Sequence, residues 1–353
     1  MRKFYIGILA ALSLMLFAAC AGHDYRYAQE YRWVFDTRVS VAVHYYGTEG
    51  GRDFRQHRDI ASEAADLVYQ FDKLFNRFDP ESDIYRINYA GGEWVEVNEH
   101  TMSILQQGIA FRLMSNGRVD ITIGAVMDLW DFGFYSEHLV PSQADIDRAL
   151  ETIGADIYFD IENNRVRLSN PDSRIDLGAL AKGYAADYVA EFLHAQGVSA
   201  IVNFQGDIRL VGNHPEHGVW GLGISDPHGG PLAEPILGVQ VPGGYASVTS
   251  GTTARGFMQD GRRFHHIMDV DTGWPMVTEF TSITAIAHTA LLGEFMVSLI
   301  YVTPFEQLNE VIAELGIFAE AIFLDETGGV SWTGGVGMLG EPGVRFPMWA
   351  VPQ

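Results

Sequence analysis

Residues 175–187 combine an aspartate, glycines and a lysine in a pattern suited to binding a phosphate. A strand is expected to end at Asp176, a glycine allows a tight turn, and a helix then begins near Ala179. The start of such a helix offers free N–H groups and the positive end of its dipole. Lys182, one of only three lysines, lies in the first turn, where a cation is unfavourable unless an anion is nearby. The pattern predicts an anion site; the alternative is a helix capped by Asp176 with Lys182 in solvent.

A second segment could hold a metal ion. Glu294 and Ser298 are four residues apart in a predicted helix, so both face the same side. Their carboxylate and hydroxyl are hard oxygen ligands of the kind that Mg²⁺ or Ca²⁺ prefers. A surface glutamate and a serine bonded to its own helix would give the same pattern.

A pair of histidines could supply a base. His265 and His266 end a predicted strand, and alternation sends their side chains to opposite faces. One is expected to be structural, and the other could act as a general base beside a phosphate, unless it too is simply packed and hydrogen-bonded. Zinc is disfavoured, because no second histidine stands at a ligand spacing and the mature chain offers no thiolate.

The elements that must position these residues mix helices and strands irregularly. Hairpins, including one turning at Asn163 and Asn164, replace a regular βαβ spacing, which favours an α+β fold. Helices are predicted at residues 60–78, 101–115, from Ser142, and at 179–197, 292–301 and 305–316. Strands are predicted at residues 39–46, 94–97, 157–159, 165–168, 200–203, 219–224, 236–241, 245–249, 264–268 and 282–287, with two short strands at the end.

The first residues have the pattern of an export signal. Arg2 and Lys3 precede an uncharged apolar run at residues 4–19, which ends in small residues before Cys20. The run is short for a membrane-spanning helix, and the cysteine is placed to receive a lipid. We therefore expect a lipoprotein signal at residues 1–19, a lipid-anchored tether at 20–30 and one domain at 31–353. An uncleaved anchor helix is the alternative.

Charge and cysteine usage narrow the class of protein. The net charge of -22 argues against a free-standing nucleic-acid binder, which would usually be basic. Cys20 is the only cysteine, so a disulfide, a thiolate metal site and a cysteine nucleophile are excluded from the mature chain.

Taken in order, four motifs resemble the ApbE family of FAD:protein FMN transferases. One runs from Asp176 through Lys182-Gly183-Tyr184-Ala185 to Asp187. The others are Thr249-Ser250-Gly251 with His266, Asp269 and Thr272-Gly273; Asp120 and Thr122 with Trp130 and Phe132-Gly133; and Phe78-Asp79-Pro80 with Ser82 and Ile87-Asn88. The resemblance extends from about Phe35 to Ser298.

This resemblance implies a single T-fold-like α+β domain with mixed and antiparallel sheets, an FAD pocket and a Mg²⁺ site. The catalytic base would be His266, oriented by Asp269, and the metal ligands would be the Ala179 carbonyl, Glu294 and Ser298. The implied FAD contacts are Phe35, Phe78, Arg118, Val119, Asp120, Asp176, Lys182 and Met268.

The metal helix departs from the family pattern, which has aspartate and threonine where this chain has Glu294 and Ser298. Glutamate reaches one methylene further, and serine lacks the methyl that restricts the threonine rotamer. Because Mg²⁺ demands near-ideal octahedral geometry, a weaker site or one for Ca²⁺ or Mn²⁺ is the alternative.

The implied activity is transfer of FMN from FAD to a threonine or serine hydroxyl of an acceptor protein, with release of AMP. The expected acceptor is a subunit of a membrane redox complex, and the enzyme is expected to be held at the extracytoplasmic face of the membrane by its lipid. The alternatives are a metal-dependent FAD pyrophosphatase and a non-catalytic FAD-binding lipoprotein.

Overall fold

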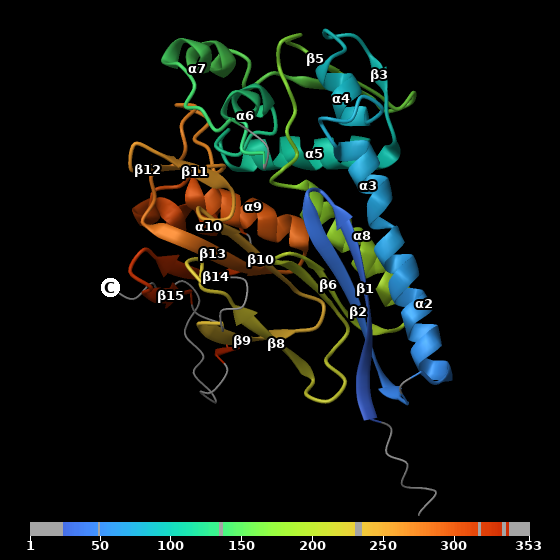
Figure 1. Cartoon of the computed structure of the whole chain (residues 1–353). Helices are drawn as coiled ribbons and strands as arrows, with labels where there is room; N and C mark the ends of the chain where they lie inside the picture. The colour runs from blue at the N-terminus through green and yellow to red at the C-terminus, as the bar shows by residue number, and fades with distance from the viewer. Residues whose placement is uncertain are drawn as a thin grey trace, which may run out of the picture.

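The computed structural model describes residues 24–333 except 49, 134–136, 230–234 and 317–318, and also residues 337–338. Its centre is a sheet in which every neighbouring pair of strands is antiparallel (Figure 1). In spatial order the strands are β1 (Asp24–Val34), β2 (Thr37–Gly47), β6 (Ser199–Phe204), β7 (Asp207–Val211), β10 (Ala246–Gly251), β13 (Phe280–Ala287), β14 (Ala319–Asp325) and β15 (Val330–Trp332).

Three helices pack on one face of this sheet. Helix α2 (Arg52–Asp66) packs on β1 and β2, α8 (Ala181–Ala195) on β6 and β7, and α9 (Ala290–Tyr301) on β10 and β13. Between these helices and the sheet lies the main core, which includes Phe71, Phe204 and Phe295. On the other face, β8 (Val219–Ile224), β9 (Leu237–Pro242) and β16 (Gly337–Met338) form a small sheet that buries Trp220 against Leu210 and Ile322.

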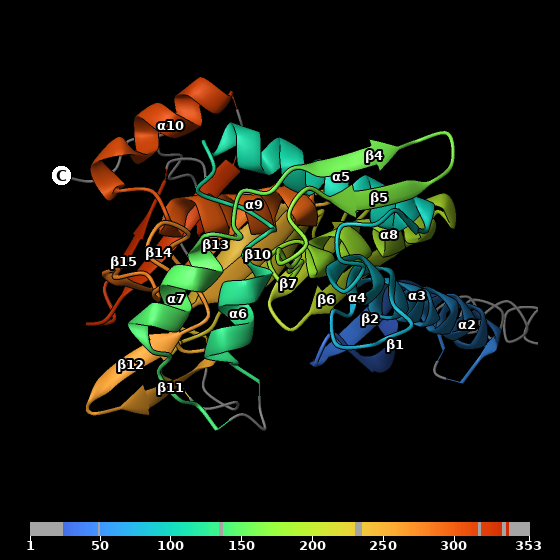
Figure 2. The ribbon, with the colours of Figure 1, turned by 90° about the horizontal axis from the view of Figure 1, so that it is seen from above.

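The remaining elements gather at one end of the main sheet (Figures 1 and 2). This end contains α3 (Val68–Phe75), α4 (Asp83–Asn88), α5 (Glu99–Met114), α6 (Gly124–Trp130), α7 (Gln143–Leu150), the β11–β12 hairpin (Gly256–Gln259 and Arg262–His265) and the sheet of β3 (Val95–Glu96), β5 (Arg165–Leu168) and β4 (Ile157–Asp160). A 3-10 turn (η1, Phe305–Gln307) and α10 (Leu308–Leu315) connect α9 to β14. None of the helices in the described part of the chain combines the length and apolarity that a membrane span requires.

The α+β prediction is confirmed, as are most predicted elements. Ser142 caps α7, its side chain accepting the N–H of Asp145, and Asn163 and Asn164 lie in the turn of the β4–β5 hairpin. The predicted strand before Asp176 is only a parallel bridge between Ile123 and Arg174. The predicted helix over residues 60–78 begins earlier, at Arg52, and is divided after Asp66 into α2 and α3.

The tether predicted for residues 20–30 needs correction, because β1 begins at Asp24. This strand pairs with β2 along its whole length, from Asp24 opposite Gly47 to Val34 opposite Thr37. Its start is held by Tyr25, whose hydroxyl contacts Nδ1 of His44 and lies 2.8 Å from Nε2 of His214. Burial, helped by the charge of His214, lowers the pKa of His44 to about 4.

Candidate functional site

Two buried carboxylates share one lysine at the start of α8. The Lys182 ammonium pairs with Asp207, the first residue of β7, and its Nζ lies 3.5 Å from Oε1 of Glu294 on α9. Burial acts to lower the pKa of Lys182, but the charges of Asp207 and Glu294 outweigh it and the pKa is raised. The pKa of Glu294 is also raised, mainly by burial and further by Asp207, against the attraction of Lys182. Three segments far apart in the sequence therefore meet at one charged cluster.

Close contact between α8 and α9 brings Glu294 to this cluster. Asp187 on α8 accepts the N–H groups of Ala290 and Leu291 at 2.8 and 2.9 Å, so it caps the start of α9, and Nε of Arg209 also bonds it at 2.9 Å. Gly183 faces the same place, where an added Cβ would lie 2.8 Å from main-chain atoms of Ala290. The close packing of α8 against α9 thus depends on Gly183 and Asp187, which belong to the same motif.

The cluster has the donor chemistry of a divalent-cation site. Oδ1 of Asp207 and Oε2 of Glu294 are buried without a hydrogen-bond partner, which is costly for carboxylate oxygens unless a cation joins them. Ser298 follows one turn later on α9, and Ala179 lies in the exposed turn just before α8. The described residues contain no group of three or more His, Cys, Asp or Glu side chains arranged for a metal, so the fit rests on carboxylates combined with a hydroxyl and a carbonyl.

His266 lies beside this cluster with its ring neutral. Nδ1 is 3.3 Å from the carbonyl oxygen of Arg255, which can only accept, so we assign the ring proton to Nδ1 and leave Nε2 free to take a proton. Burial above all, with the positive charges of Arg255 and Lys182, lowers the pKa of His266 to about 4. His265, the last residue of β12, is buried.

Asp269 has a different neighbour from the one expected. Its carboxylate accepts the N–H of Asp271 at 2.9 Å, and its carbonyl accepts the N–H of Gly273 at 2.8 Å, so it shapes the turn after His266. Among the described contacts, the group that orients His266 is the Arg255 carbonyl.

An arginine missed by sequence reasoning holds Asp176. Nη1 of Arg77 lies 3.2 Å from Oδ2 of Asp176, and Nη2 lies 2.9 Å from Oδ1 of Asp128. The guanidinium also lies 4.6 Å from the ring centre of Phe78, which is exposed. The other oxygen of Asp176 accepts the N–H of Gly178 at 2.6 Å. Arg77 and the Gly178 N–H therefore hold the two carboxylate oxygens of Asp176 in the turn before Lys182. The Phe78 ring lies beside this turn and is exposed to solvent.

The Phe35 turn joins the site through Arg255. Phe35 adopts a positive φ of 52°, and its carbonyl lies 3.4 Å from Nη2 of Arg255, the residue whose own carbonyl holds His266. The N–H of Phe35 bonds Oδ1 of Asp72 at 3.1 Å. Contacts thus join Phe35 to Arg255 and Arg255 to His266, and the charges of Arg255 and Lys182 both act on the His266 ring.

The side chains of most other predicted FAD contacts already bond or pack against other residues of the protein. The Asp120 carboxylate bonds Nε of Arg112 at 3.1 Å and both N–H and hydroxyl of Thr122 at 2.8 Å. Val119 is buried, Arg118 is half-buried, and Met268 packs in a cluster with Trp130 and Phe264. Val119, Asp120 and Met268 would therefore contact FAD mainly through main-chain atoms or through the edge of a packed side chain.

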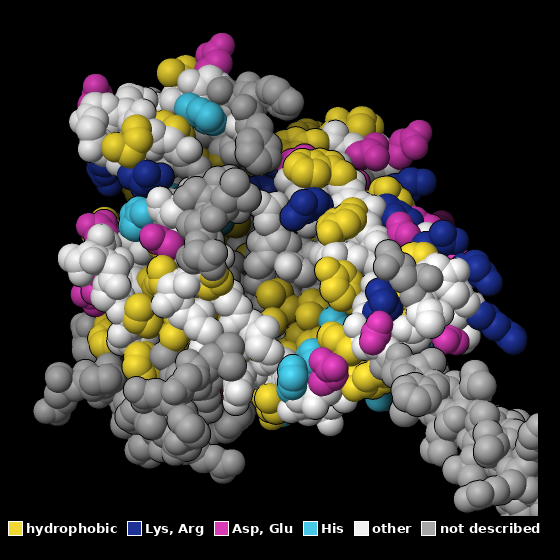
Figure 3. Space-filling view, turned by 60° about the horizontal axis from the view of Figure 1, so that its bottom comes forward, with side chains coloured by type: hydrophobic (Ala, Val, Ile, Leu, Met, Phe, Trp, Pro, Cys, Tyr) yellow, Lys and Arg dark blue, Asp and Glu magenta, His cyan; other side chains and the backbone are white. Residues whose placement is uncertain are grey.

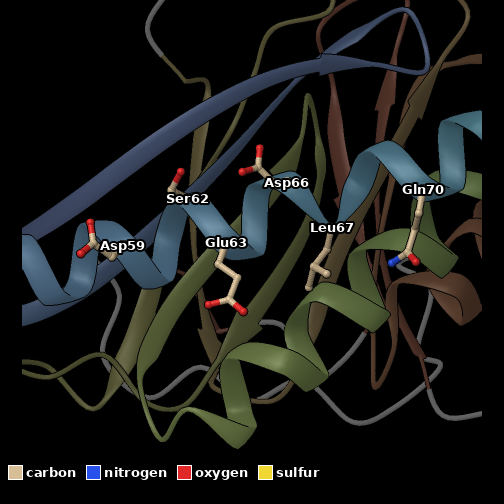
Figure 4. Close-up of a pocket in the computed structure, with 6 residues that line it drawn as sticks. All are labelled: Asp59, Ser62, Glu63, Asp66, Leu67 and Gln70. Carbon is tan, nitrogen blue, oxygen red and sulfur yellow. The ribbon is translucent and has the colours of Figure 1, made fainter.

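A hollow of about 540 Å³ opens elsewhere, along α2 and the residues that follow it (Figure 4). Its lining carries three carboxylates and no basic side chain, which would repel a diphosphate. We therefore place the candidate site at Lys182 and His266 on chemical grounds. The hollow is lined by Asp59, Ser62, Glu63, Asp66, Leu67 and Gln70.

Comparison with known proteins gives one consistent result. Residues 35–323 match the model of the ApbE family. An FAD:protein FMN transferase of Klebsiella pneumoniae is 33% identical over 245 residues, which is 69% of this chain and 75% of the relative. One from Escherichia coli K12 is 26% identical over 310 residues, 86% of this chain and 83% of the relative. The crystal structure of the ApbE protein of Thermotoga maritima superposes with a TM-score of 0.76 at 30% identity, covering 86% of this chain and 96% of that one.

Proposed function

The chain belongs to the ApbE family, and from that premise we propose that this transferase moves the FMN half of FAD to a threonine or serine hydroxyl of an acceptor protein. The observation that carries the proposal is His266, whose Nδ1 lies 3.3 Å from the Arg255 carbonyl so that Nε2 can take a proton, in a place where the charge of Lys182 acts on its ring. A base for the attacking hydroxyl and a positive charge for the phosphate oxygens both favour attack on a diphosphate.

The steps follow from the positions of these side chains. Nε2 of His266 takes the proton of the acceptor hydroxyl, and the hydroxyl oxygen forms a bond to the FMN phosphorus. The bond from that phosphorus to the oxygen bridging the two phosphates breaks, and AMP leaves with that oxygen and the electron pair. Lys182 stabilises negative charge on the phosphate oxygens.

Glu294, with Ser298 and the Ala179 carbonyl, would hold a divalent cation, and Mg²⁺ is the ion we propose. The cation would neutralise charge on the diphosphate. The longer reach of glutamate leaves Mn²⁺ and Ca²⁺ as competing ions, which a comparison of metal affinities can rank.

The test combines the purified chain with FAD, Mg²⁺ and a candidate acceptor, and measures covalent flavin fluorescence and the mass of the acceptor. We expect His266→Gln to lower the transfer rate about 10²–10⁴-fold, the usual contribution of a general base, with FAD binding retained. FMN and AMP formed without acceptor would identify a pyrophosphatase instead. A folded, FAD-bound chain with no turnover would identify a binding protein.

The same test extends to the unusual metal helix. Restoring the family residues with Glu294→Asp and Ser298→Thr should leave the rate nearly unchanged if this site is adapted to its own ligands. A large gain in rate would show that the natural site is degenerate.

We also propose that the chain is exported and held at the membrane by a lipid on Cys20, where its acceptor is a subunit of a membrane redox complex. The apolar run at residues 4–19 before the only cysteine supports this location. Mass spectrometry of the mature N-terminal peptide tests it, because diacylglycerol on Cys20 adds a defined mass. A Cys20→Ser chain should lose the modification.

A further inference from the structure

We propose that the end of the molecule where β1 begins lies flat on the lipid bilayer, so that it is a second membrane contact besides the lipid on Cys20. We call this region the anchor end. It consists of the start of β1, the end of β2 and the first two turns of α2. The proposal rests on the lipid anchor proposed above and adds a surface and an orientation to it.

The first argument is the length of chain between Cys20 and the fold. Only residues 21–23 separate Cys20 from Asp24, where β1 begins. Four peptide steps at no more than about 3.6 Å each span roughly 14 Å. A lipid on Cys20 would therefore keep the start of β1 within that distance of the membrane surface. A domain this close to the bilayer must present one of its faces to the headgroups.

The second argument is the kind of side chain at the anchor end. Tyr27 and Tyr46 are 55% and 43% exposed there, and Phe54 is half-buried on the neighbouring turn of α2. Tyrosine suits the headgroup region, because its ring is apolar and its hydroxyl stays hydrated. Figure 3 turns this end forward and shows hydrophobic side chains there among basic, acidic and histidine side chains.

A hollow of about 450 Å³ opens at the same place and strengthens the argument. Four aromatic rings and the guanidinium of Arg26 form its walls, a combination that can take the glycerol backbone and phosphate of a phospholipid. The guanidinium also lies 3.1 Å from Oδ2 of Asp24 and 3.3 Å from the Gly47 carbonyl, so a lipid phosphate would share it with these groups. The lining of the hollow is Tyr25, Arg26, Tyr27, Tyr45 and Phe54.

The anchor end has no excess of negative charge. Arg26, Arg52, Arg55 and Arg58 stand against Asp24, Asp53, Asp59 and Glu216, four positive charges to four negative, in a chain with a net charge of -22. Anionic headgroups would repel most other surfaces of so acidic a protein.

The opposite end carries the candidate site. Val34 ends β1, and the following turn contains Phe35, which contacts Arg255. Figure 1 shows α4, α6 and the β11–β12 hairpin at that end, away from the start of β1. Contact through the anchor end would therefore leave the flavin site facing away from the bilayer and open to an acceptor.

The experiment uses the lipidated full chain in vesicles of phosphatidylethanolamine and phosphatidylglycerol that contain a headgroup spin-labelled lipid. Because Cys20 is the only cysteine and its thiol would carry the lipid, Thr48→Cys and Leu113→Cys each create one site for a fluorescent dye. Thr48 is exposed just after β2 at the anchor end, and Leu113 is 74% exposed on α5 at the other end. We expect the spin label to quench the dye at position 48 several-fold more than the dye at position 113.

Equal quenching at the two positions, with the lipid present on Cys20, would overturn the proposed surface and leave the anchor standing. A mass without lipid on Cys20 would remove the anchor and the proposal with it. Flavin transfer to a soluble acceptor, measured on the same samples, tests the proposed transferase activity independently of the membrane contact.

A second variant separates the surface from the lipid. Tyr27→Ser with Tyr46→Ser, Arg52→Ser and Arg55→Ser should reduce the quenching at position 48 several-fold, to the level that the tether on Cys20 gives without surface contact, while the lipid keeps the protein on the vesicles. Tyr69→Ser, which removes a tyrosine of similar exposure from α3, is the matched control and should change nothing. Undiminished quenching in the quadruple variant would refute the role of these side chains.

Discussion

Asp207→Asn should make the candidate site both less stable and weaker for metal. The substitution keeps the size of the side chain and removes one of the two buried negative charges around Lys182. Lys182 then has only Glu294, 3.5 Å away, as a charged partner. The ammonium should move toward Glu294 and compete with any cation that Glu294 binds.

The size of both effects can be worked from this geometry. Removing one partner of a buried ion pair costs about 3–5 kcal/mol. Lys182 retains Glu294 and its side chain is 28% exposed, so we expect roughly 2–3 kcal/mol, at or just below the lower end of that range. At about 2–4 °C per kcal/mol, the melting temperature should fall by roughly 5–10 °C. Loss of the neighbouring charge should weaken metal binding about 10–100-fold, as for other groups that support a ligand.

The assay is thermal unfolding of the wild-type and variant chains over a Mg²⁺ or Mn²⁺ titration. The variant should start at a lower melting temperature and need a higher metal concentration for the same upward shift. Asp160→Asn is the matched control, since its partner Arg165 is on the surface, and it should leave both quantities unchanged. An Asp207→Asn chain with wild-type metal affinity would refute the idea that the charge of Asp207 supports cation binding by Glu294.

Three further results should follow from the structure. Because the pKa of His266 is lowered to about 4, kcat/KM for flavin transfer should be level above about pH 5 and fall only as the pH approaches 4; an inflection near 6.5 would contradict this. His44 is neutral when folded, with its pKa lowered to about 4, and takes up a proton on unfolding below pH 6.5. Its contribution, about 2 kcal/mol after allowing for solvent, should be lost as the pH falls from 6.5 to 4, which denaturant unfolding of wild type and His44→Gln can compare. Gly183→Ala would press a methyl group against Ala290 and should cost about 1–3 kcal/mol together with most metal affinity; an unchanged calorimetric melting temperature would show that α8 and α9 can separate freely.

Much of the fold could be predicted because the spacing of apolar residues and the residues typical of turns are local features of the sequence. The apolar spacing of the helices and the Asn163-Asn164 turn are such signals. Strand β1 was missed because its polar and aromatic residues look like a solvated segment, and only its pairing with β2 makes it a strand. Strand β7 was missed because it is short and follows a turn at Gln205 and Gly206, both of positive φ.

The site was predicted as a set of motifs, and the missing residues were those defined by tertiary contact. Asp207 begins β7 and Arg77 lies in the turn after α3, so neither has a sequence pattern of its own apart from lying beside a recognised motif. The carbonyl of Arg255, which orients His266, leaves no mark in the sequence because any residue has a carbonyl. Lys182 was singled out by its place in the first turn of a helix, whereas Glu294 and His266 were assigned roles through the resemblance to the ApbE family.

Strand β1 also acts as a spacer of fixed length. Its 11 residues, at about 3.3 Å each, make it roughly 35 Å long from Asp24 to Val34. In the orientation proposed above, with the start of β1 at the lipid headgroups, the Phe35 turn and the site behind it would stand several tens of ångströms above them, at a height set by the length of the paired strand. An acceptor whose hydroxyl lies flush with the membrane would be out of reach, so partners should be those that raise their flavin-bearing segment to this height.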